Sequence, residues 1–250
     1  MRFMGRAHEV RKASMEKTAK AKAKLYSKYG KEIYLVAKSG GPEPEGNLAL
    51  RSLIDKAKKA QVPADVIKRA IDKVKSGATE NYETLKFEGF GPGDSTLIVE
   101  CLTDNVNRTL SQVRPAFTKS KAKLGAAGSV SYLYDTISVL VFKGLDEEAT
   151  LEALMEGEVD VRDLEALEDG SLKITGEPQD LTKIREALQT ACPEIDFDTD
   201  EITTIPQEYT TLEGEEMELF ERLMTLLSDC DDVDTVYHNV SNYDDGSEEE

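Results

Sequence analysis

Lysine residues recur in the N-terminal part of the chain at intervals that match one face of an α-helix. They are separated by three, four, four and three positions: Lys17, Lys20, Lys24, Lys28 and Lys31. On a helix these side chains share an arc of about 80° and form a row about 21 Å long. Neighbours of like charge at i,i+4 repel one another by roughly a few tenths of a kcal/mol, and a row of phosphates would relieve that repulsion. This lysine stripe therefore predicts phosphate contact, with an ordinary solvated helix face as the alternative.

Further basic residues extend this candidate surface. Four of them precede the stripe, and Arg108 follows a predicted strand where a helix begins. Backbone amides at such a helix start can meet an anion, although capping by Asp104 or Asn105 alone explains the segment. The predicted nucleic-acid-binding residues are Arg6, His8, Arg11, Lys12, Lys17, Lys20, Lys24, Lys28, Lys31 and Arg108.

Side chains that read base edges are scarce along this surface. Bidentate recognition of bases uses mainly Arg, Asn and Gln, whereas the stripe consists of Lys, so we expect weak sequence readout. Tyr26, Tyr29 and Tyr34 can stack on unpaired bases. Their helical spacing with Leu25 and Ile33 favours a place in the hydrophobic core instead.

Residues for catalysis or metal binding form no recognisable constellation. The two histidines are His8 and His238, and no Ser/His/Asp or Cys/His arrangement has a local signature. Carboxylate pairs such as Asp231-Asp232 are too many, and too exposed in pattern, to single out as general acid and base. The cysteines do not have metal-ligand spacing. We therefore predict a non-enzymatic protein with no metal and no cofactor.

The charge is distributed unevenly along the chain. Residues 1–75 hold 19 Lys and Arg against eight Asp and Glu, a net charge of +11, whereas residues 76–250 hold 12 against 41, a net charge of −29. This asymmetry favours a nucleic-acid-binding module joined to an acidic body. The alternative is that the two parts pack together and neutralise each other, which would make the basic face less available to phosphates.

Composition narrows the class of protein further. Of the 250 residues, 39% are hydrophobic and 32% are charged, and the overall net charge is −18. No stretch approaches the ~20 apolar residues of a membrane span. Met1 leads into charge rather than into a hydrophobic run, so we expect no secretory signal. The cysteines are odd in number and widely separated, which favours reduced thiols: Cys101, Cys192 and Cys230. We predict a soluble, cytoplasmic monomer.

The basic part of the chain is predicted to be helical. Residues 9–38 are rich in Ala, Lys and Glu, although Gly30 is expected to weaken or bend the helix. The Gly/Pro-rich segment 39–47 is a predicted loop. An apolar stripe from Leu50 to Ala57 indicates a second helix, and Pro63 suits the first turn of a third. Three helices in 75 residues can form a small bundle.

The remainder alternates short strands with helices. The predicted strands are 83–88, 96–102, 129–134, 138–142, 160–167, 171–174, 195–206 and 235–239. The predicted helices are 105–121, 146–155, 179–190 and 213–227. The glycine-rich segments 88–94 and 124–129 are predicted turns; the first lacks the Lys-Ser/Thr of a P-loop and carries a protruding Phe90.

This order predicts an α+β fold with three domains: an N-terminal three-helix domain followed by two ferredoxin-like α+β domains, one inserted in the other. The predicted parts are a basic helical domain (1–77), a middle domain (78–135 plus 202–243), an inserted domain (136–201) and an acidic tail (244–250).

Several motifs together give the chain a resemblance to the YebC/PmpR family, in its YeeN-like branch. The N-terminal ones are Met4-Gly5-Arg6-Ala7, Glu9, Arg11-Lys12-Ala13, Gly40-Gly41-Pro42-Glu43-Pro44-Glu45-Gly46-Asn47, Ala60-Gln61-Val62-Pro63 and Ile67-Lys68-Arg69-Ala70-Ile71. The most specific block is Glu88-Gly89-Phe90-Gly91-Pro92-Gly93 followed by Glu100 to Thr109, with Leu124-Gly125 and Gly128-Ser129-Val130. Two departures are Lys121-Ala122-Lys123, where the family has Gly-Gly-Asn, and the absence of the His-Ser-Lys-Trp typical of the YebC branch.

The resemblance implies the same three domains and a regulatory function. Members of the family are described as DNA-binding transcriptional regulators. Others, including the mitochondrial translational activator of cytochrome c oxidase, act on the ribosome, and bacterial relatives relieve stalls at proline runs. We therefore expect duplex DNA or ribosomal RNA as the partner, with basic ribosomal or transcription proteins for the acidic domains. A protein-interaction scaffold without nucleic-acid binding is the third possibility.

Overall fold

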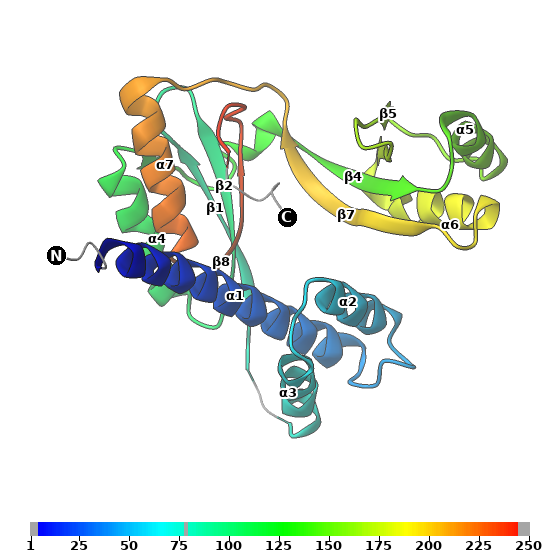
Figure 1. The fold of residues 1–250 in the computed structure, drawn as a ribbon, viewed down its shortest axis with the longest axis horizontal. Helices are drawn as coiled ribbons and strands as arrows, with labels where there is room; N and C mark the ends of the chain where they lie inside the picture. The colour runs from blue at the N-terminus through cyan, green and yellow to red at the C-terminus, as the bar shows by residue number, and fades with distance from the viewer. Residues whose placement is uncertain (1–4, 78–79, 245–250) are drawn as a thin grey trace. The chain divides into compact units, whose positions relative to one another are not determined.

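The structure is a computed structural model that describes residues 5–77 and 80–244, and along the first helix it describes side chains at position 19 and from position 21 onward. The chain divides into two compact units (Figure 1). One comprises residues 1–87, 99–124 and 218–236; the other comprises residues 88–98, 125–217 and 237–250. The expected acidic tail falls, except for its first residue, outside the described residues.

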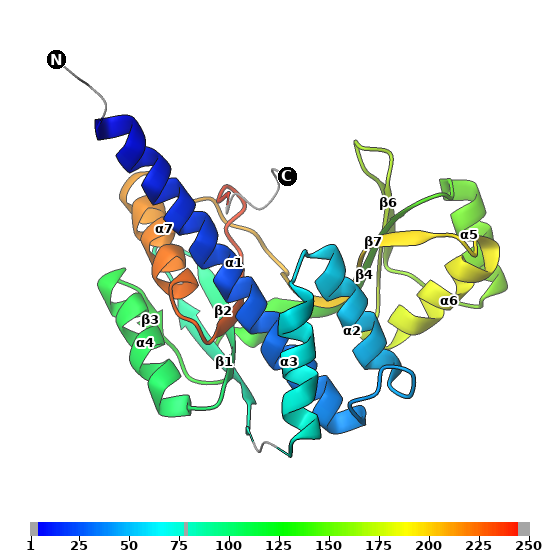
Figure 2. The same cartoon turned by 60° about the horizontal axis from the view of Figure 1, so that its bottom comes forward.

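The basic N-terminal region forms the expected three helices. They are α1 (Gly5–Gly40), α2 (Leu48–Lys59) and α3 (Ala64–Lys75). Figure 2 shows α2 and α3 against the C-terminal half of α1, where Ile33, Tyr34 and Ala37 are buried together with residues of both other helices. The apolar stripes predicted from the sequence therefore form one core. Helix α1 continues through Gly30, which does not interrupt it.

Asn47 fixes the loop between α1 and α2. Its side-chain oxygen accepts a hydrogen bond from the Leu50 amide (3.1 Å), which caps α2. Its amide nitrogen donates to the carbonyl oxygens of Val36 (3.1 Å) and Gly41 (2.9 Å) at the end of α1. A Cβ atom at Gly40 would lie 2.6 Å from that nitrogen, so this close approach requires glycine.

The first sheet has the strand order β3-β1-β2-β8. Its strands are β1 (Glu83–Phe90), β2 (Thr96–Thr103), β3 (Lys123–Leu124) and β8 (Val233–His238). In the chain, helix α4 (Val106–Lys119) follows β2 and helix α7 (Gly214–Ser228) precedes β8. The expected strand 129–134 is wrong: residues 131–133 form a 3₁₀ turn, η1 (Ser131–Leu133). The carboxylate of Glu88 explains the difference, because it accepts hydrogen bonds from the amides of Gly128, Val130 and Ser131 that a strand would use for pairing.

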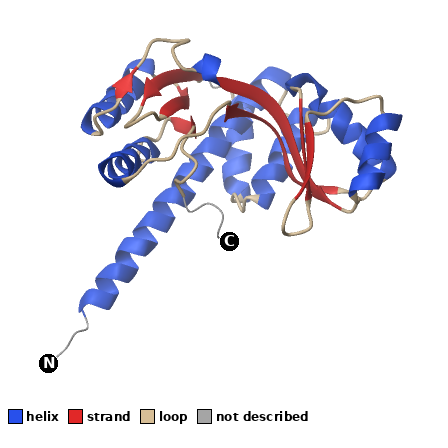
Figure 3. Ribbon diagram, turned by 90° about the horizontal axis from the view of Figure 1, so that it is seen from above, coloured by secondary structure: helices blue, strands red, loops and turns tan. Residues whose placement is uncertain are grey.

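The second sheet is antiparallel with the order β5-β6-β4-β7. Along the chain its elements are β4 (Tyr134–Lys143), α5 (Glu147–Glu156), β5 (Asp163–Ala166), β6 (Leu172–Gly176), η2 (Pro178–Asp180), α6 (Leu181–Ala191) and β7 (Asp196–Pro206). This is the β-α-β-β-α-β order expected for the inserted domain. Helices α5 and α6 cover one face of the sheet (Figure 3), and Phe142, Leu154 and Leu188 contribute to the core between them.

Candidate nucleic-acid interface

Two members of the lysine stripe contact the end of α7 and the start of β8. Lys24 Nζ donates a hydrogen bond to the carbonyl oxygen of Ser228 at 3.0 Å. One turn further along α1, Lys28 Nζ lies 3.2 Å from Asp234 Oδ1, and both side chains are partly exposed. Spacing by four residues places these lysines on the same face of α1. That face therefore binds oxygen atoms of an acidic segment within the protein's own fold.

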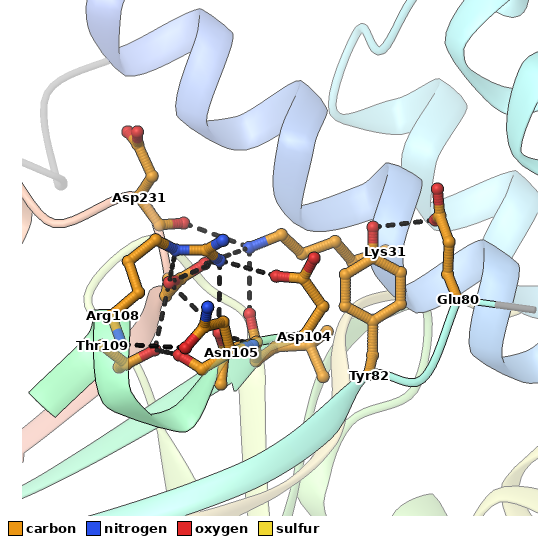
Figure 4. A network of polar contacts seen from close by, with 11 residues as sticks. Lys31, Glu80, Tyr82, Asp104, Asn105, Arg108, Thr109 and Asp231 are labelled. Carbon is orange, nitrogen blue, oxygen red and sulfur yellow. Dashed lines mark hydrogen bonds and ion pairs between the residues drawn. The ribbon is translucent and has the colours of Figure 1, made fainter.

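Lys31, the last member of the stripe, reaches into a cluster of oxygen atoms. Its Nζ donates to the carbonyl oxygen of Leu102 (2.9 Å), to Asp232 Oδ1 (3.1 Å) and to the carbonyl oxygen of Asp231 (3.3 Å). Figure 4 shows the side chain extended from α1 toward Asp231 and the start of α4. With three acceptors for its three N–H groups, the ammonium group is fully satisfied.

Asp232 is the centre of this cluster, and its side chain is 3% exposed. Arg108 donates two hydrogen bonds to the carboxylate, from Nε to Oδ2 (3.0 Å) and from Nη2 to Oδ1 (2.9 Å). The hydroxyls of Thr103 and Thr109 donate to Oδ2 at 3.1 and 3.0 Å. A buried carboxylate is stable only with such charged and polar partners. The arrangement thus locks α1, α4 and the segment before β8 together.

The local sequence explains how Arg108 reaches this position. Asn105 caps α4 by accepting a hydrogen bond from the Arg108 amide at 3.0 Å, as the sequence allowed. The Arg108 Nη2 also lies 2.7 Å from Asp104 Oδ1, which is half exposed (Figure 4). The Arg108 side chain is itself 43% exposed. One edge of the guanidinium therefore binds carboxylates while the group remains open to water.

Electrostatics keep the Asp232 carboxyl ionised at neutral pH. Burial by itself would raise the pKa of the Asp232 carboxyl, but hydrogen bonds from Arg108 and Lys31 outweigh it and hold the pKa below its usual range. Hydrogen bonds to the carboxylates of Asp232 and Asp104 raise the pKa of the Arg108 guanidinium. Burial lowers the pKa of Lys24.

The predicted site residues fall into two groups. Lys31 and Arg108 bind Asp232, and Lys24 and Lys28 contact oxygen atoms of Ser228 and Asp234. The other six lie outside the residues whose side chains the structure describes: Arg6, His8, Arg11, Lys12, Lys17 and Lys20. The inner half of the stripe, Lys24 to Lys31, packs against the acidic segment 228–234. This is the packing of basic against acidic parts that the charge asymmetry left open as an alternative.

Asp232 corrects one expectation from the sequence. The Asp231-Asp232 pair was expected to be exposed, whereas the Asp232 side chain is almost fully buried. No local signal could have found it, since its partners Lys31 and Arg108 lie 201 and 124 positions away in the chain. Its ion pairs give it a structural place rather than that of a general acid or base.

The aromatic and sulfur-containing residues have mainly packing positions. Tyr34 is buried in the helical core, and Tyr26 and Tyr29 pack against it. Cys101 and Cys230 are buried free thiols, and burial raises the pKa of Cys101 to about 12. Within the described part of the chain, no three His, Cys, Asp or Glu side chains converge as a metal site would require. No helix among the described residues is long and apolar enough to span a membrane.

Comparison with known proteins identifies the family. The model of the TACO1/YebC protein N-terminal domain matches residues 6–77, and the model of the TACO1/YebC second and third domain matches residues 82–240. A protein of Shewanella oneidensis is 53% identical over 95% of this chain and 98% of its own, and one of a Marinomonas species is 55% identical over 95% and 99%. Both are named probable transcriptional regulatory proteins.

A solved structure agrees with the fold. The crystal structure of a conserved hypothetical protein from Aquifex aeolicus matches 88% of this chain and 90% of that chain, with a TM-score of 0.70 and 34% sequence identity. The matched family models cover the chain from its first helix to the end of the first sheet. The chain therefore belongs to the TACO1/YebC family.

Proposed function

We propose that this protein is a non-enzymatic regulator that binds nucleic acid through its basic helical domain, with duplex DNA as its target in transcriptional control. The observation that carries the proposal is the net charge of +11 confined to residues 1–75 of an otherwise acidic chain. The names of its relatives support regulation rather than catalysis. The compartment we propose is the cytoplasm, and we propose that the protein acts as a monomer.

The contacts of the lysine stripe suggest a division of labour along α1. Lys24, Lys28 and Lys31 hold the helix against the acidic segment 228–234, so they act as its anchor. Phosphate contact then falls to the preceding half of the helix: Arg6, His8, Arg11, Lys12, Lys17 and Lys20. Arg108 acts with the anchor, since carboxylates already hold its guanidinium.

A second candidate target is ribosomal RNA. Lysine ammonium groups contact phosphates as point charges and carry no base-reading geometry. Recognition of folded RNA by shape and backbone requires only such contacts. In this form the protein is a translation factor that relieves stalls at proline runs, and its acidic domains face basic ribosomal proteins.

A sucrose gradient of fresh lysate, with and without DNase or RNase, tests the proposal. Release from fast-sedimenting material by DNase supports the DNA target, whereas co-migration with ribosomal subunits that survives DNase supports the RNA target. Protein that stays at the top of every gradient contradicts nucleic-acid binding altogether and favours the protein-interaction scaffold.

Charge-reversal variants show whether α1 is responsible. Lys17→Glu/Lys20→Glu is expected to move the protein to the top of the gradient. The matched control, Lys119→Glu/Lys123→Glu, makes the same change in net charge at two exposed lysines outside the helical domain and should sediment as the wild type does.

A further inference from the structure

A pocket of about 330 Å³ lies beside α1 and α3, next to the anchor residue Lys31, which forms part of its lining. Helices α1 and α3 form its walls, and Glu80 and Tyr82, just before β1, complete it. The volume is at the lower end of the range of small-molecule sites, about 300–1,000 Å³. All of its lining residues belong to the same compact unit. It is therefore large enough for one small planar ligand.

Gly30 opens this pocket from the middle of α1. Glycine is unfavourable in the interior of a helix compared with alanine. Packing does not require it here, because a Cβ atom at this position would meet only Val66 Cγ1, at an ordinary distance of 3.7 Å. The space left by the missing side chain belongs to the pocket.

Three tyrosines line the pocket, and the partly exposed rings of Tyr26 and Tyr82 supply its accessible aromatic surface. Tyr34 is buried, and Tyr82 meets it edge to face with ring centroids 5.7 Å apart. Tyr26, half-buried on α1, lines the pocket as well as packing against the core. Flat aromatic surfaces of this kind stack on nucleobases irrespective of sequence.

Polar groups surround these rings. The Tyr82 hydroxyl donates to Glu80 Oε2 at 2.9 Å (Figure 4), and the Glu80 amide donates to the Tyr34 hydroxyl oxygen at 3.0 Å. Lys73 Nζ lies 2.9 Å from Glu80 Oε1, and this hydrogen bond helps to hold the pKa of Glu80 below its usual value. The ring of Tyr82 is thereby fixed in place beside an ionised carboxylate that can accept N–H groups of a base.

Arg69 adds a cation at the rim. Its side chain is exposed, and its Nε donates to the carbonyl oxygen of Asp65 at 3.0 Å, whereas its two Nη groups have no hydrogen-bond partner among the described residues. A guanidinium with free N–H groups binds phosphate in a bidentate manner. Aromatic surface, a hydrogen-bond acceptor and a phosphate-binding cation are thus within one site.

We propose that this pocket binds a single unpaired nucleotide, with the base against Tyr26 and Tyr82 and its phosphate on Arg69. The proposal deepens the proposed function, on which it rests, by adding a site for unpaired nucleic acid to a surface that otherwise contacts backbone phosphates. A base inside a duplex is stacked on both sides and cannot enter, so the pocket distinguishes single strands, loops and ends from paired segments.

Binding of fluorescein-labelled octanucleotides to the full chain tests this proposal. The probes are single-stranded RNA, single-stranded DNA and a blunt duplex, and the two single strands distinguish an RNA source from a DNA source. Tyr26→Leu, Arg69→Ala and Gly30→Met are each expected to weaken single-strand binding about tenfold and to leave duplex binding unchanged. Quenching of tyrosine emission reports stacking directly, because the chain contains no Trp.

Matched controls use neighbours that do not line the pocket. Tyr29→Leu removes a half-buried tyrosine from the same helix, and Lys68→Ala removes the exposed cation adjacent to Arg69; both should bind single strands as the wild type does. Gly30→Ala serves as a milder filling variant, with circular dichroism confirming that it folds.

The outcomes separate this proposal from the one on which it rests. If the pocket variants bind single strands as tightly as the wild type, or lose duplex binding to the same extent, the pocket proposal is wrong while nucleic-acid binding stands. If the wild type binds none of the probes, both proposals are wrong.

Discussion

Asp232 connects parts of the chain that are far apart in sequence. Its carboxylate binds Lys31 from α1 and Arg108 from α4, while the hydroxyls of Thr103 and Thr109 fill its remaining acceptor positions. Removing this carboxylate leaves the largely buried Lys31 ammonium without a counter-charge, and that loss is larger than the net contribution of the pair.

Asp232→Asn is therefore expected to lower the free energy of unfolding by about 2–3 kcal/mol. The expected loss is below the ~3–5 kcal/mol of a fully buried pair because Arg108 keeps contact with water. Urea unfolding followed by circular dichroism measures it. Asp104→Asn is the matched control, since Asp104 binds the same guanidinium at an exposed site, and it should cost at most about 0.5 kcal/mol. Equal losses for the two variants would contradict the central place of Asp232.

The lowered pKa of Asp232 predicts a pH dependence of defined sign. An unfolded Asp titrates near pH 3.9, and the folded carboxyl titrates below that, so the unfolded state binds the proton more readily and stability rises with pH through this range. The contribution is complete above about pH 5 and is lost as the pH falls through the folded pKa. The stability difference between the wild type and Asp232→Asn should be constant from pH 5 to 8, within about 0.5 kcal/mol, and shrink below pH 4. Urea midpoints at each pH measure it; a difference that grows on acidification would show the opposite sign.

At the scale of elements, Gly30 and Gly40 of α1 have different reasons to be glycine. Gly30 lies in the helix interior beside open space, whereas Gly40 faces the Asn47 side chain. Helix propensity disfavours glycine at both positions, but a steric contact with a Cβ atom requires glycine only at position 40.

We expect opposite effects from the same substitution at these two positions. Gly30→Ala should raise the free energy of unfolding by about 0.5–1 kcal/mol, because it removes the helix-interior penalty without a clash. Gly40→Ala should lower it by about 1–2 kcal/mol, because the new methyl group displaces Asn47 from its hydrogen bonds. Thermal unfolding of both variants measures this. A gain in stability at Gly40, or a loss at Gly30, would show that the packing around α1 differs from that described.

Asn47→Ala probes the same loop from the other side. The substitution removes the cap of α2 and the hydrogen bonds that Asn47 donates to the carbonyl groups of Val36 and Gly41. A loss of about 1–2 kcal/mol is expected. Ser39→Ala, at an exposed neighbour that bonds only back to Val36, should change stability by less than about 0.5 kcal/mol. The melting temperatures of the two variants give the comparison.

Periodicity predicted most elements of this fold. The apolar stripes of α1, α2 and α3 and the order of the inserted domain were readable because each buries one regular face. The two-residue strand β3 (Lys123–Leu124) was missed because two residues carry no period. The wrong strand at 129–134 arose because the apolar sequence there matches a strand, while the Glu88 carboxylate captures its amides from 40 positions away.

At the scale of the whole molecule, the charge asymmetry was visible in sequence but its internal partner was not. The stripe's spacing predicted phosphate contact on one face of α1, whereas Lys24, Lys28 and Lys31 contact oxygen atoms of the protein itself. Which oxygen atoms they meet depends on the order β3-β1-β2-β8, in which β8 pairs beside β2. Local patterns contain no record of such long-range pairing.

The salt dependence of binding tests nucleic-acid contact by the helical domain most directly. Fluorescence anisotropy with a 20-bp duplex DNA, and with an RNA hairpin of the same length, gives the affinity at a series of salt concentrations. Each phosphate that a protein neutralises contributes about −0.9 to the slope of log affinity against log salt on duplex DNA. The wild type should show a steep negative slope, Lys17→Glu/Lys20→Glu should bind weakly with a slope shallower by about 2, and Lys119→Glu/Lys123→Glu should match the wild type. Wild-type binding that is absent, or that keeps the same slope after reversal of Lys17 and Lys20, would contradict the account.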